Sequence, residues 1–211
     1  MEKYDVIIVG AGPAGMFAAL EITKKNPNLK IAVMDMGSRI ENRSSKEVMS
    51  GFGGAGTYSD GKLHFTPKLS HERTFHLIKP EDYQTILNEI DETFMSFGVD
   101  SEEYPKNRYD VEMMIDEAQR HDIELIVRRM KHVGSDKLKE VMKNFQDYLE
   151  DKGVTLMEKT EVLDIMVENG KATGVKTNKG DMFADNILVA PGRIRARWFQ
   201  EICSKYNIEY I

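Results

Sequence analysis

The chain has 211 residues, of which 41% are hydrophobic and 30% are charged, so it can fold as one large domain or as one domain with an insertion. Its 35 acidic against 29 basic side chains give a net charge of −6, which makes nucleic acid an unfavourable partner. One cysteine, Cys203, excludes an intrachain disulfide. With no signal-peptide or membrane-spanning pattern, this predicts a cytoplasmic protein without a membrane partner.

The first elements predicted along the chain form a strand–helix–strand unit. Residues 4–9 are an apolar run typical of a strand that is buried on both faces of a parallel sheet. A glycine-rich turn follows, then a helix over residues 13–25, which ends before Pro27. Residues 30–36 read as a second strand, so the segment has the length and order of a βαβ unit.

The middle of the chain changes from a loop to helices. Residues 37–67 are rich in Gly and Ser and predict a long ordered loop, with a short helical piece at 45–50. Apolar spacing then predicts helices at 80–98, around 111–118 and at 135–153. Between the last two, Ile123, Leu125 and Val127 alternate as in a short strand.

From residue 154 the pattern alternates, and turn dipeptides recur. Asn169-Gly170 and the turn at residues 178–180 predict a β-meander over 160–184. A buried strand at 186–190 and a closing helix at 195–206 follow. The fold class predicted is α/β, a three-layer Rossmann-like FAD/NAD(P)-binding domain with a β-meander, made of residues 1–66 and 152–211. We expect residues 67–151 to form a mainly helical insertion, and the meander to cross one side of the parallel sheet.

The glycine-rich turn reads Gly10-Ala11-Gly12-Pro13-Ala14-Gly15. In a dinucleotide site, Gly10 permits a tight turn, Gly12 lets the main chain approach a pyrophosphate, and Gly15 lets helix and strand pack closely. Asp35, after the second strand, would accept hydrogen bonds from a ribose diol and disfavours the 2′-phosphate of NADP. The alternative is a glycine-rich turn without a ligand and an ordinary surface acid, and the turn alone does not identify the dinucleotide.

Other candidate sites are weaker. His64, His71, His76, His121 and His132 lack the spacing of a zinc site, so no metal is expected. The basic cluster of Arg128, Arg129, Lys131 and His132 is either a solvated face or a docking site for phosphate or NAD(P)H. Cys203 has no Cys-x-x-Cys partner, which argues against a redox-active disulfide.

Four segments together carry a resemblance to a known superfamily. They are residues 5–19, the glycine-rich residues 51–63, residues 132–136, and the stretch from Thr173-Gly-Val175 to Ala190-Pro-Gly-Arg193. The chain resembles the FAD-dependent dehydrogenases of the glutathione-reductase-like flavoprotein superfamily, and more narrowly a group of longer NAD(FAD)-utilising dehydrogenases. The segment at 51–63 is the most specific part, because a generic Rossmann protein has no reason to contain it.

The resemblance implies an oxidoreductase that transfers hydride through bound FAD, with NAD(P)H as a candidate electron donor and a small molecule of unknown identity as substrate. The pyrophosphate would lie against Gly10, Gly12, Pro13, Ala14 and Gly15, the adenosine ribose against Asp35, and the phosphates near Arg43. The flavin end would lie against Gly53, Gly54, Ala55, Ser59, Gly61 and Lys62. Val162 would approach the adenine through its main chain, and the remaining contacts would come from Ala190, Pro191 and Gly192. The candidates for contact with flavin or substrate are Ser59, Asp60 and Lys62, which could instead only order their loop.

One departure from the superfamily leaves a second interpretation open. Related flavoproteins close the flavin site with a further Gly-Asp motif near the C-terminus, which is not found before Ile211. The alternative is therefore a truncated or split, non-catalytic dinucleotide-binding fragment that needs a C-terminal half, a partner chain or self-association. Such a fragment would expose apolar side chains at residues 187–189 and on the helix with Trp198 and Phe199.

Overall fold

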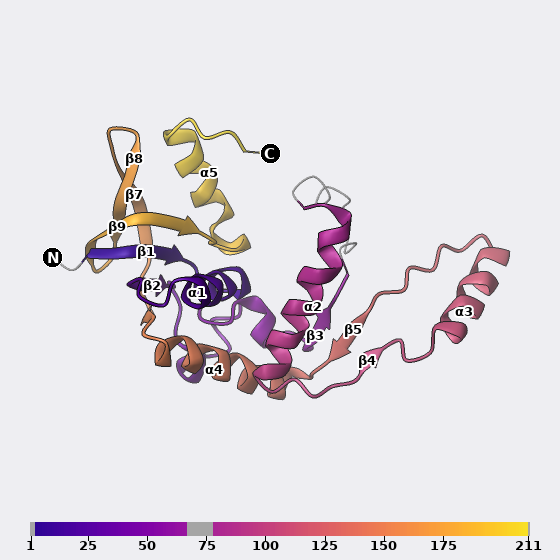
Figure 1. Cartoon of the computed structure of the whole chain (residues 1–211). Helices are drawn as coiled ribbons and strands as arrows, with labels where there is room; N and C mark the ends of the chain where they lie inside the picture. Colours follow the sequence, from indigo (N-terminus) through magenta and orange to yellow (C-terminus); the bar gives the residue numbers. More distant parts are fainter. Residues whose placement is uncertain (1–2, 67–77, 211) are drawn as a thin grey trace. The chain divides into compact units, whose positions relative to one another are not determined.

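The computed structural model describes residues 3–66 and 78–210 (Figure 1). The chain divides into two compact units, one made of Met1–Tyr58 with Met142–Ile211 and the other of Ser59–Val141. The sequence instead suggested an insertion that begins at residue 67, which lies outside the described residues, and ends at residue 151. The first unit holds the glycine-rich turn and is treated first.

The predicted strand–helix–strand unit at the start of the chain is confirmed. It consists of β1 (Lys3–Val9), α1 (Pro13–Lys25) and β2 (Ile31–Met34). Strands β1 and β2 pair in parallel, with Val6 opposite Ile31 and Val9 opposite Met34. Every residue of β2 is buried, as the apolar run predicts for a strand inside a parallel sheet.

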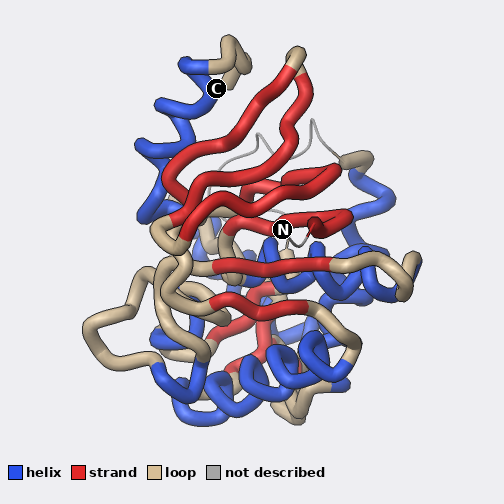
Figure 2. Tube along the Cα trace, turned by 90° about the vertical axis from the view of Figure 1, so that its left-hand side faces the viewer, coloured by secondary structure: helices blue, strands red, loops and turns tan. Residues whose placement is uncertain are grey.

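The sheet of the first unit has six strands in the order β6-β2-β1-β9-β8-β7. Figure 2 shows the strands in red. Its remaining strands are β6 (Thr155–Met157), β7 (Val162–Glu168), β8 (Lys171–Thr177) and β9 (Gly180–Val189). Strand β9 pairs antiparallel with β8 at its start and parallel with β1 over the rest of its length. The expectation of a meander separate from a strand at 186–190 is therefore wrong, because no breaker interrupts residues 184–186 and the meander continues the sheet.

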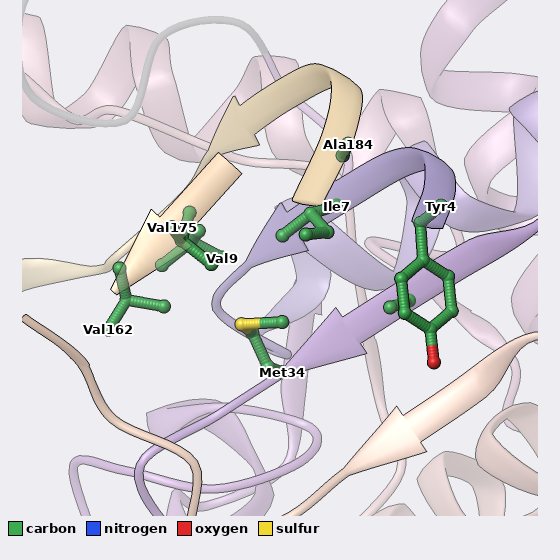
Figure 3. Packing of buried hydrophobic residues seen from close by; sticks show 8 residues of the cluster. Tyr4, Ile7, Val9, Met34, Val162, Val175 and Ala184 are labelled. Carbon is green, nitrogen blue, oxygen red and sulfur yellow. The ribbon is translucent and has the colours of Figure 1, made fainter. Parts of the chain in front are cut away.

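Both faces of this sheet are covered, which confirms the three-layer prediction. On one face Gly15 of α1 packs against Ile8, so closely that a Cβ at position 15 would lie 3.3 Å from the Ile8 side chain. Successive side chains of a strand point to opposite faces, so Ile7 and Val9 belong to the other face. There they join a buried cluster that also holds Tyr4, Ala32, Met34, Val162, Val175 and Ala184 (Figure 3). Trp198 of α5 (Ala196–Lys205) packs against this cluster.

The second unit combines helices with a small sheet. Its helices are α2 (Pro80–Ser96) and α3 (Arg108–Arg120), while α4 (Ser135–Asp151) begins in this unit and ends in the first. These helices match the three apolar patterns in the sequence. A three-stranded antiparallel sheet, which the sequence did not predict, has the order β3-β5-β4. Its strands are β3 (Lys62–His64), β4 (Glu103–Tyr104) and β5 (Met130–His132).

Two short elements predicted from the sequence are wrong. Residues 123–127 form no strand, and Ile123 is 58% exposed, since no strand in the described part of the chain pairs with this stretch. Residues 45–50 form no helix. The described part of this loop instead has two short 3-10 helices, η1 (Ile40–Asn42) and η2 (Ala55–Tyr58). Among the described helices, none is long and apolar enough to cross a membrane.

Candidate functional site

A pocket of the first unit opens at the carboxyl ends of the parallel strands β1, β2 and β9. Val9 and Gly10, Met34 and Asp35, and Ala190 lie where these strands end, and all of them line the pocket. Ligands of open α/β sheets bind at this edge, outside the carboxyl ends of the strands. The position of the pocket is therefore set by the topology of the sheet.

The glycine-rich turn forms one wall, and its three glycines meet different surroundings. Gly10 has φ +102°, and a Cβ there would lie 2.1 Å from the Ala190 carbonyl oxygen. A Cβ on Gly15 would lie 1.9 Å from the Gly10 oxygen, whereas a Cβ on Gly12 would meet only Gly54, at 3.8 Å. Gly10 and Gly15 are therefore required by the fold, and Gly12 leaves space on the pocket side.

The start of α1 supplies hydrogen-bond donors to the same wall. Gly12 is the N-cap residue, Pro13 opens the helix, and no side chain caps the first turn. The amides of a first helical turn have no partner within the helix, and together with the helix dipole they favour an anionic group. The turn therefore fits a phosphate or pyrophosphate.

Asp35 lies at the pocket with its carboxylate directed at main-chain amides. Its Oδ2 accepts a hydrogen bond from the Ala11 N–H at 2.9 Å. Its Oδ1 accepts from the N–H groups of Gly37 at 2.9 Å and Gly51 at 2.7 Å. The carboxylate thus connects the glycine-rich turn, the end of β2 and the loop before η2.

Arg43 is buried, with 5% of its surface exposed, and it forms hydrogen bonds with main-chain carbonyls of the same loop. Its guanidinium donates at 2.7–3.2 Å to the carbonyls of Glu47, Val48, Phe52 and Gly54. It also lies 4.7 Å from the centre of the Tyr58 ring. Burial lowers the pKa of the guanidinium, against the opposing charges of Tyr58, Asp35 and Glu47.

The opposite wall comes from the start of β7 and from the segment that leads into α5. Arg195 donates to the Glu161 carboxylate at 2.5 Å and to the Val162 carbonyl at 2.8 Å. Its guanidinium also stacks on Trp198, 5.0 Å from the ring centre. The indole N–H of Trp198 donates to the Leu163 carbonyl at 2.9 Å. These contacts hold α5 against β7 beside the pocket.

The structure brings many of the site residues suggested by the sequence to one pocket. Those that line it are Gly10, Gly12, Pro13, Asp35, Gly54, Ala55, Val162, Ala190, Pro191 and Gly192. Others stand behind this wall: Gly53 donates its N–H to the Ala11 carbonyl at 2.8 Å, and Gly15 packs under the turn. Ala14 follows Pro13 in the first turn of α1. Direct contact of these residues with a cofactor stays a prediction.

The remaining candidates belong to the second unit, and their relation to the pocket stays a prediction. Lys62 pairs with Asp60 at 2.7 Å, and the hydrogen bond from Lys62 lowers the pKa of Asp60. The Gly61 carbonyl accepts the N–H of Val133, and the Gly61 N–H lies 3.3 Å from the Ser59 hydroxyl. These contacts order the segment that leads into β3.

Much of the basic cluster of Arg128, Arg129, Lys131 and His132 forms ion pairs and hydrogen bonds within the second unit. Lys131 forms a buried ion pair with Asp91 at 2.6 Å, and Arg129 donates to Glu103 at 2.5 Å. The imidazole of His132 contacts the Asp60 carbonyl at 3.0 Å. In the described residues, no group of three or more His, Cys, Asp or Glu side chains could hold a metal ion; His71 and His76 lie outside those residues.

Several pocket residues were missed by reasoning from the sequence. They are Met36, Met49, Ser50, Gly51, Thr160, Glu161, Arg193, Ile194, Arg195 and Trp198. Gly51 and Arg193 fall within the resembling segments, which was a usable signal. Met36, Met49 and Ser50 reach the pocket from the loop between β2 and η2. The remaining residues reach it because the segments that lead into β7 and α5 come to the end of the parallel strands, and no local motif marks either approach.

Comparison with solved structures finds the same fold in several enzymes at low sequence identity. An L-amino acid deaminase from Proteus vulgaris, with its specific insertion sequence deleted, has a TM-score of 0.58 and 16% identity over 98% of this chain. Glycine oxidase from Bacillus cereus ATCC 14579 has a TM-score of 0.58 and 19% identity over 97% of this chain. L-proline dehydrogenase from P. horikoshii has a TM-score of 0.58 and 16% identity over 100% of this chain.

These likenesses establish the fold and leave the activity open. The chain spans 57% of the deaminase, 58% of the glycine oxidase and 57% of the proline dehydrogenase chains. No curated protein matches the chain. The family described as "FAD binding domain" matches residues 5–209, which is nearly the whole sequence. The chain therefore belongs to the FAD binding domain family.

Proposed function

We propose that this protein is an FAD-dependent oxidoreductase that passes hydride between a small-molecule substrate and a second carrier such as NAD(P)H. The observation that carries the proposal is the pocket, where an uncapped helix N-terminus meets a glycine that leaves space for a ligand. This combination suits the pyrophosphate of a dinucleotide. The family match supports FAD as that dinucleotide.

Different residues of the pocket would bind different parts of the cofactor. The main chain at Gly12 and the first turn of α1 would hold the pyrophosphate, and the segment around Val162 would face the adenosine end. When bound, FAD would supply the hydride-accepting group, while the protein contributes its position and electrostatic surroundings. Ser59, Asp60 and Lys62 stay the candidates for contact with flavin or substrate.

A second candidate function is a nucleotide-binding domain that acts only with a partner chain or another copy. It is favoured by apolar exposure beside the pocket, where Leu188 is 36% exposed and Ile194 is 47% exposed. In this case the ADP half of FAD would be held and the flavin ring held weakly.

The two functions separate in a binding and reduction experiment. The purified protein is titrated with FAD and with ADP, and the FAD complex is then mixed with NADH or NADPH without oxygen. Much tighter binding of FAD than of ADP, with bleaching of the flavin, supports the oxidoreductase. Equal affinity for FAD and ADP without reduction supports the second function, and binding of neither nucleotide contradicts both.

A further inference from the structure

We propose that Arg195 is a positioning residue for the adenosine part of the nucleotide, because it ties the turn after β9 to the start of β7. This role rests on the proposed binding of FAD in the pocket. It concerns the wall of the pocket that lies opposite the glycine-rich turn.

The turn after β9 forms a long part of this wall. Six consecutive residues, 190–195, line the pocket. None of the six is buried, and Ile194 is 47% exposed. A segment with few buried contacts has little packing to hold it in one position. Its position at the pocket therefore depends on the contacts of individual side chains.

The start of β7, by contrast, is anchored within the first unit. Val162 is 4% exposed, and its side chain lies in the buried cluster (Figure 3). The N–H of Glu161 donates to the Asn178 side-chain oxygen at 2.9 Å, and the N–H of Asn178 donates to the Glu161 carbonyl at 3.0 Å. Residues 161 and 162 both line the pocket. They form a fixed point to which the exposed turn can be attached.

Arg195 makes this attachment through both terminal nitrogens of its guanidinium. One donates to the Glu161 carboxylate at 2.5 Å, and the other donates to the Val162 carbonyl at 2.8 Å. The guanidinium also lies 5.0 Å from the centre of the Trp198 ring. The side chains of Arg195 and Glu161 are 23% and 34% exposed, so solvent screens this pair less than a fully exposed one. A lysine could not make the same contacts, since its ammonium is a point charge and not a planar fork.

The contacts of Arg195 lead to the adenosine end of the proposed ligand. The segment around Val162 would face the adenosine, whereas the first turn of α1 would face the pyrophosphate. The Glu161 carboxylate compensates the charge of Arg195, which leaves little attraction for phosphates. Loss of the guanidinium should therefore release the turn and the Trp198 ring, and weaken the binding of the adenosine part alone.

Titration with adenosine, AMP and ADP separates the two ends of the ligand. Arg195→Gln removes the charge and the planar fork, and Arg195→Lys keeps only the charge. The matched control is Arg197→Gln: the Arg197 side chain is 92% exposed, pairs with Glu201, and is not among the described residues that line the pocket. The emission of Trp198, the single tryptophan of the sequence, is recorded in the nucleotide-free proteins.

A positioning role predicts that Arg195→Gln weakens adenosine, AMP and ADP by the same factor, about tenfold. Arg195→Lys should lose nearly as much affinity, and Arg197→Gln should match the wild type. The emission of Trp198 in nucleotide-free Arg195→Gln should move to longer wavelength, because the ring loses the guanidinium that covers it and becomes more exposed to water.

Other results would overturn this role. Losses that grow from adenosine to ADP, or full affinity in Arg195→Lys, would show that the charge of Arg195 acts on the phosphates. Weaker adenosine binding with unchanged Trp198 emission would show that Arg195 contacts the nucleotide directly. Unchanged affinity for all three ligands would leave Arg195 without a role in binding. A wild type that binds neither FAD nor ADP instead contradicts the proposed function.

Glu161→Gln covers the case in which Arg195→Gln does not fold. The glutamine oxygen still accepts a hydrogen bond from Arg195 but carries no charge, so the attachment is weakened and not removed. This variant should lower the affinities for adenosine and ADP by one common factor, about threefold. Wild-type affinity of Glu161→Gln for both ligands would contradict the proposed attachment.

Discussion

Gly10 and Gly12 stand two positions apart in the same turn, yet a methyl group would clash with a main-chain oxygen at Gly10 and make only an ordinary contact, with Gly54 at 3.8 Å, at Gly12. Gly10→Ala should lower the melting temperature strongly, because the residue has φ +102° and its Cβ would lie 2.1 Å from the Ala190 oxygen. Gly12→Ala should melt like the wild type and bind FAD at least about tenfold more weakly, because its Cβ occupies the approach of the pyrophosphate. Thermal melting and FAD titration of both variants check this. A Gly12→Ala protein with full affinity would show that the pyrophosphate does not lie at this turn.

Glu47 makes the loop sensitive to acid. Burial raises the pKa of Glu47, but hydrogen bonds from Ser38 and Ser44 and the charge of Lys159 outweigh it and lower the pKa below 4.5. A lowered pKa in the folded state means that this stabilisation is present above pH 4.5 and is lost as the pH falls through the folded value.

The wild type should therefore lose more stability than Glu47→Gln between about pH 6 and pH 3. Denaturant unfolding of both proteins at the two pH values measures the difference. Glu47→Gln should be the less stable protein at about pH 6, since it lacks the charge that the amides favour. Equal pH dependence of the two proteins would show that Glu47 does not contribute in this way.

At the residue scale, the sequence predicts the residues whose roles depend only on neighbouring positions in the chain. Gly10, Gly12 and Gly15 are recognisable because their spacing between a strand and a helix is itself the motif. The three amides around Asp35 come from segments as far apart as Ala11 and Gly51, so only the folded chain shows them. The same holds for Arg43, whose carbonyl partners were not predictable from a single basic residue in a loop.

At the scale of elements, a buried ion pair connects β5 to α2. The side chains of Lys131 and Asp91 are 9% and 10% exposed, and their charged atoms are 2.6 Å apart. Lys131→Met should destabilise the second unit by about 3–5 kcal/mol, because it leaves a buried carboxylate without its main partner. The double variant Lys131→Met with Asp91→Leu should recover most of the loss. Urea unfolding of the three proteins tests this, and a double variant no more stable than the single one would contradict it.

Helix α5 covers the open edge of strand β7. Trp198 donates to the Leu163 carbonyl at 2.9 Å and Tyr206 donates to that of Ile165 at 2.6 Å. An edge strand leaves unpaired main-chain groups that favour pairing with other chains, and side chains from α5 occupy some of them here. The helix thereby protects the sheet and carries Trp198 to the pocket.

Helices and strands were predictable where a residue pattern extends over many positions, and they were missed where pairing with another strand determines the structure. Helix α1 occupies the predicted residues 13–25, because good helix formers follow Pro13 and the run stops before Pro27. Ile123, Leu125 and Val127 alternate like a strand, but no strand among residues 3–66 and 78–210 pairs with them. Strand β9 is longer than expected because two different partners, β8 and β1, extend one strand at its two ends.

At the scale of the whole molecule, the fold concentrates the chemistry at one edge of the first sheet. The parallel strands end at the pocket, and loops from distant parts of the sequence complete its walls. The α/β class and the three layers follow from the sequence because strand and helix patterns alternate around a βαβ unit. The division into units at Tyr58 and Val141 does not, because it depends on which segments pack together.

Fluorescence of Trp198 tests the central claim that this pocket binds FAD. Trp198 is the single tryptophan of the sequence, and it lines the pocket. Its emission overlaps the absorption of flavin, so FAD bound nearby should quench it. The prediction is saturable quenching with one FAD per chain, reversed by excess ADP and much weakened in Gly12→Ala. Absence of saturable quenching in a protein whose circular dichroism shows a folded α/β chain would contradict the account.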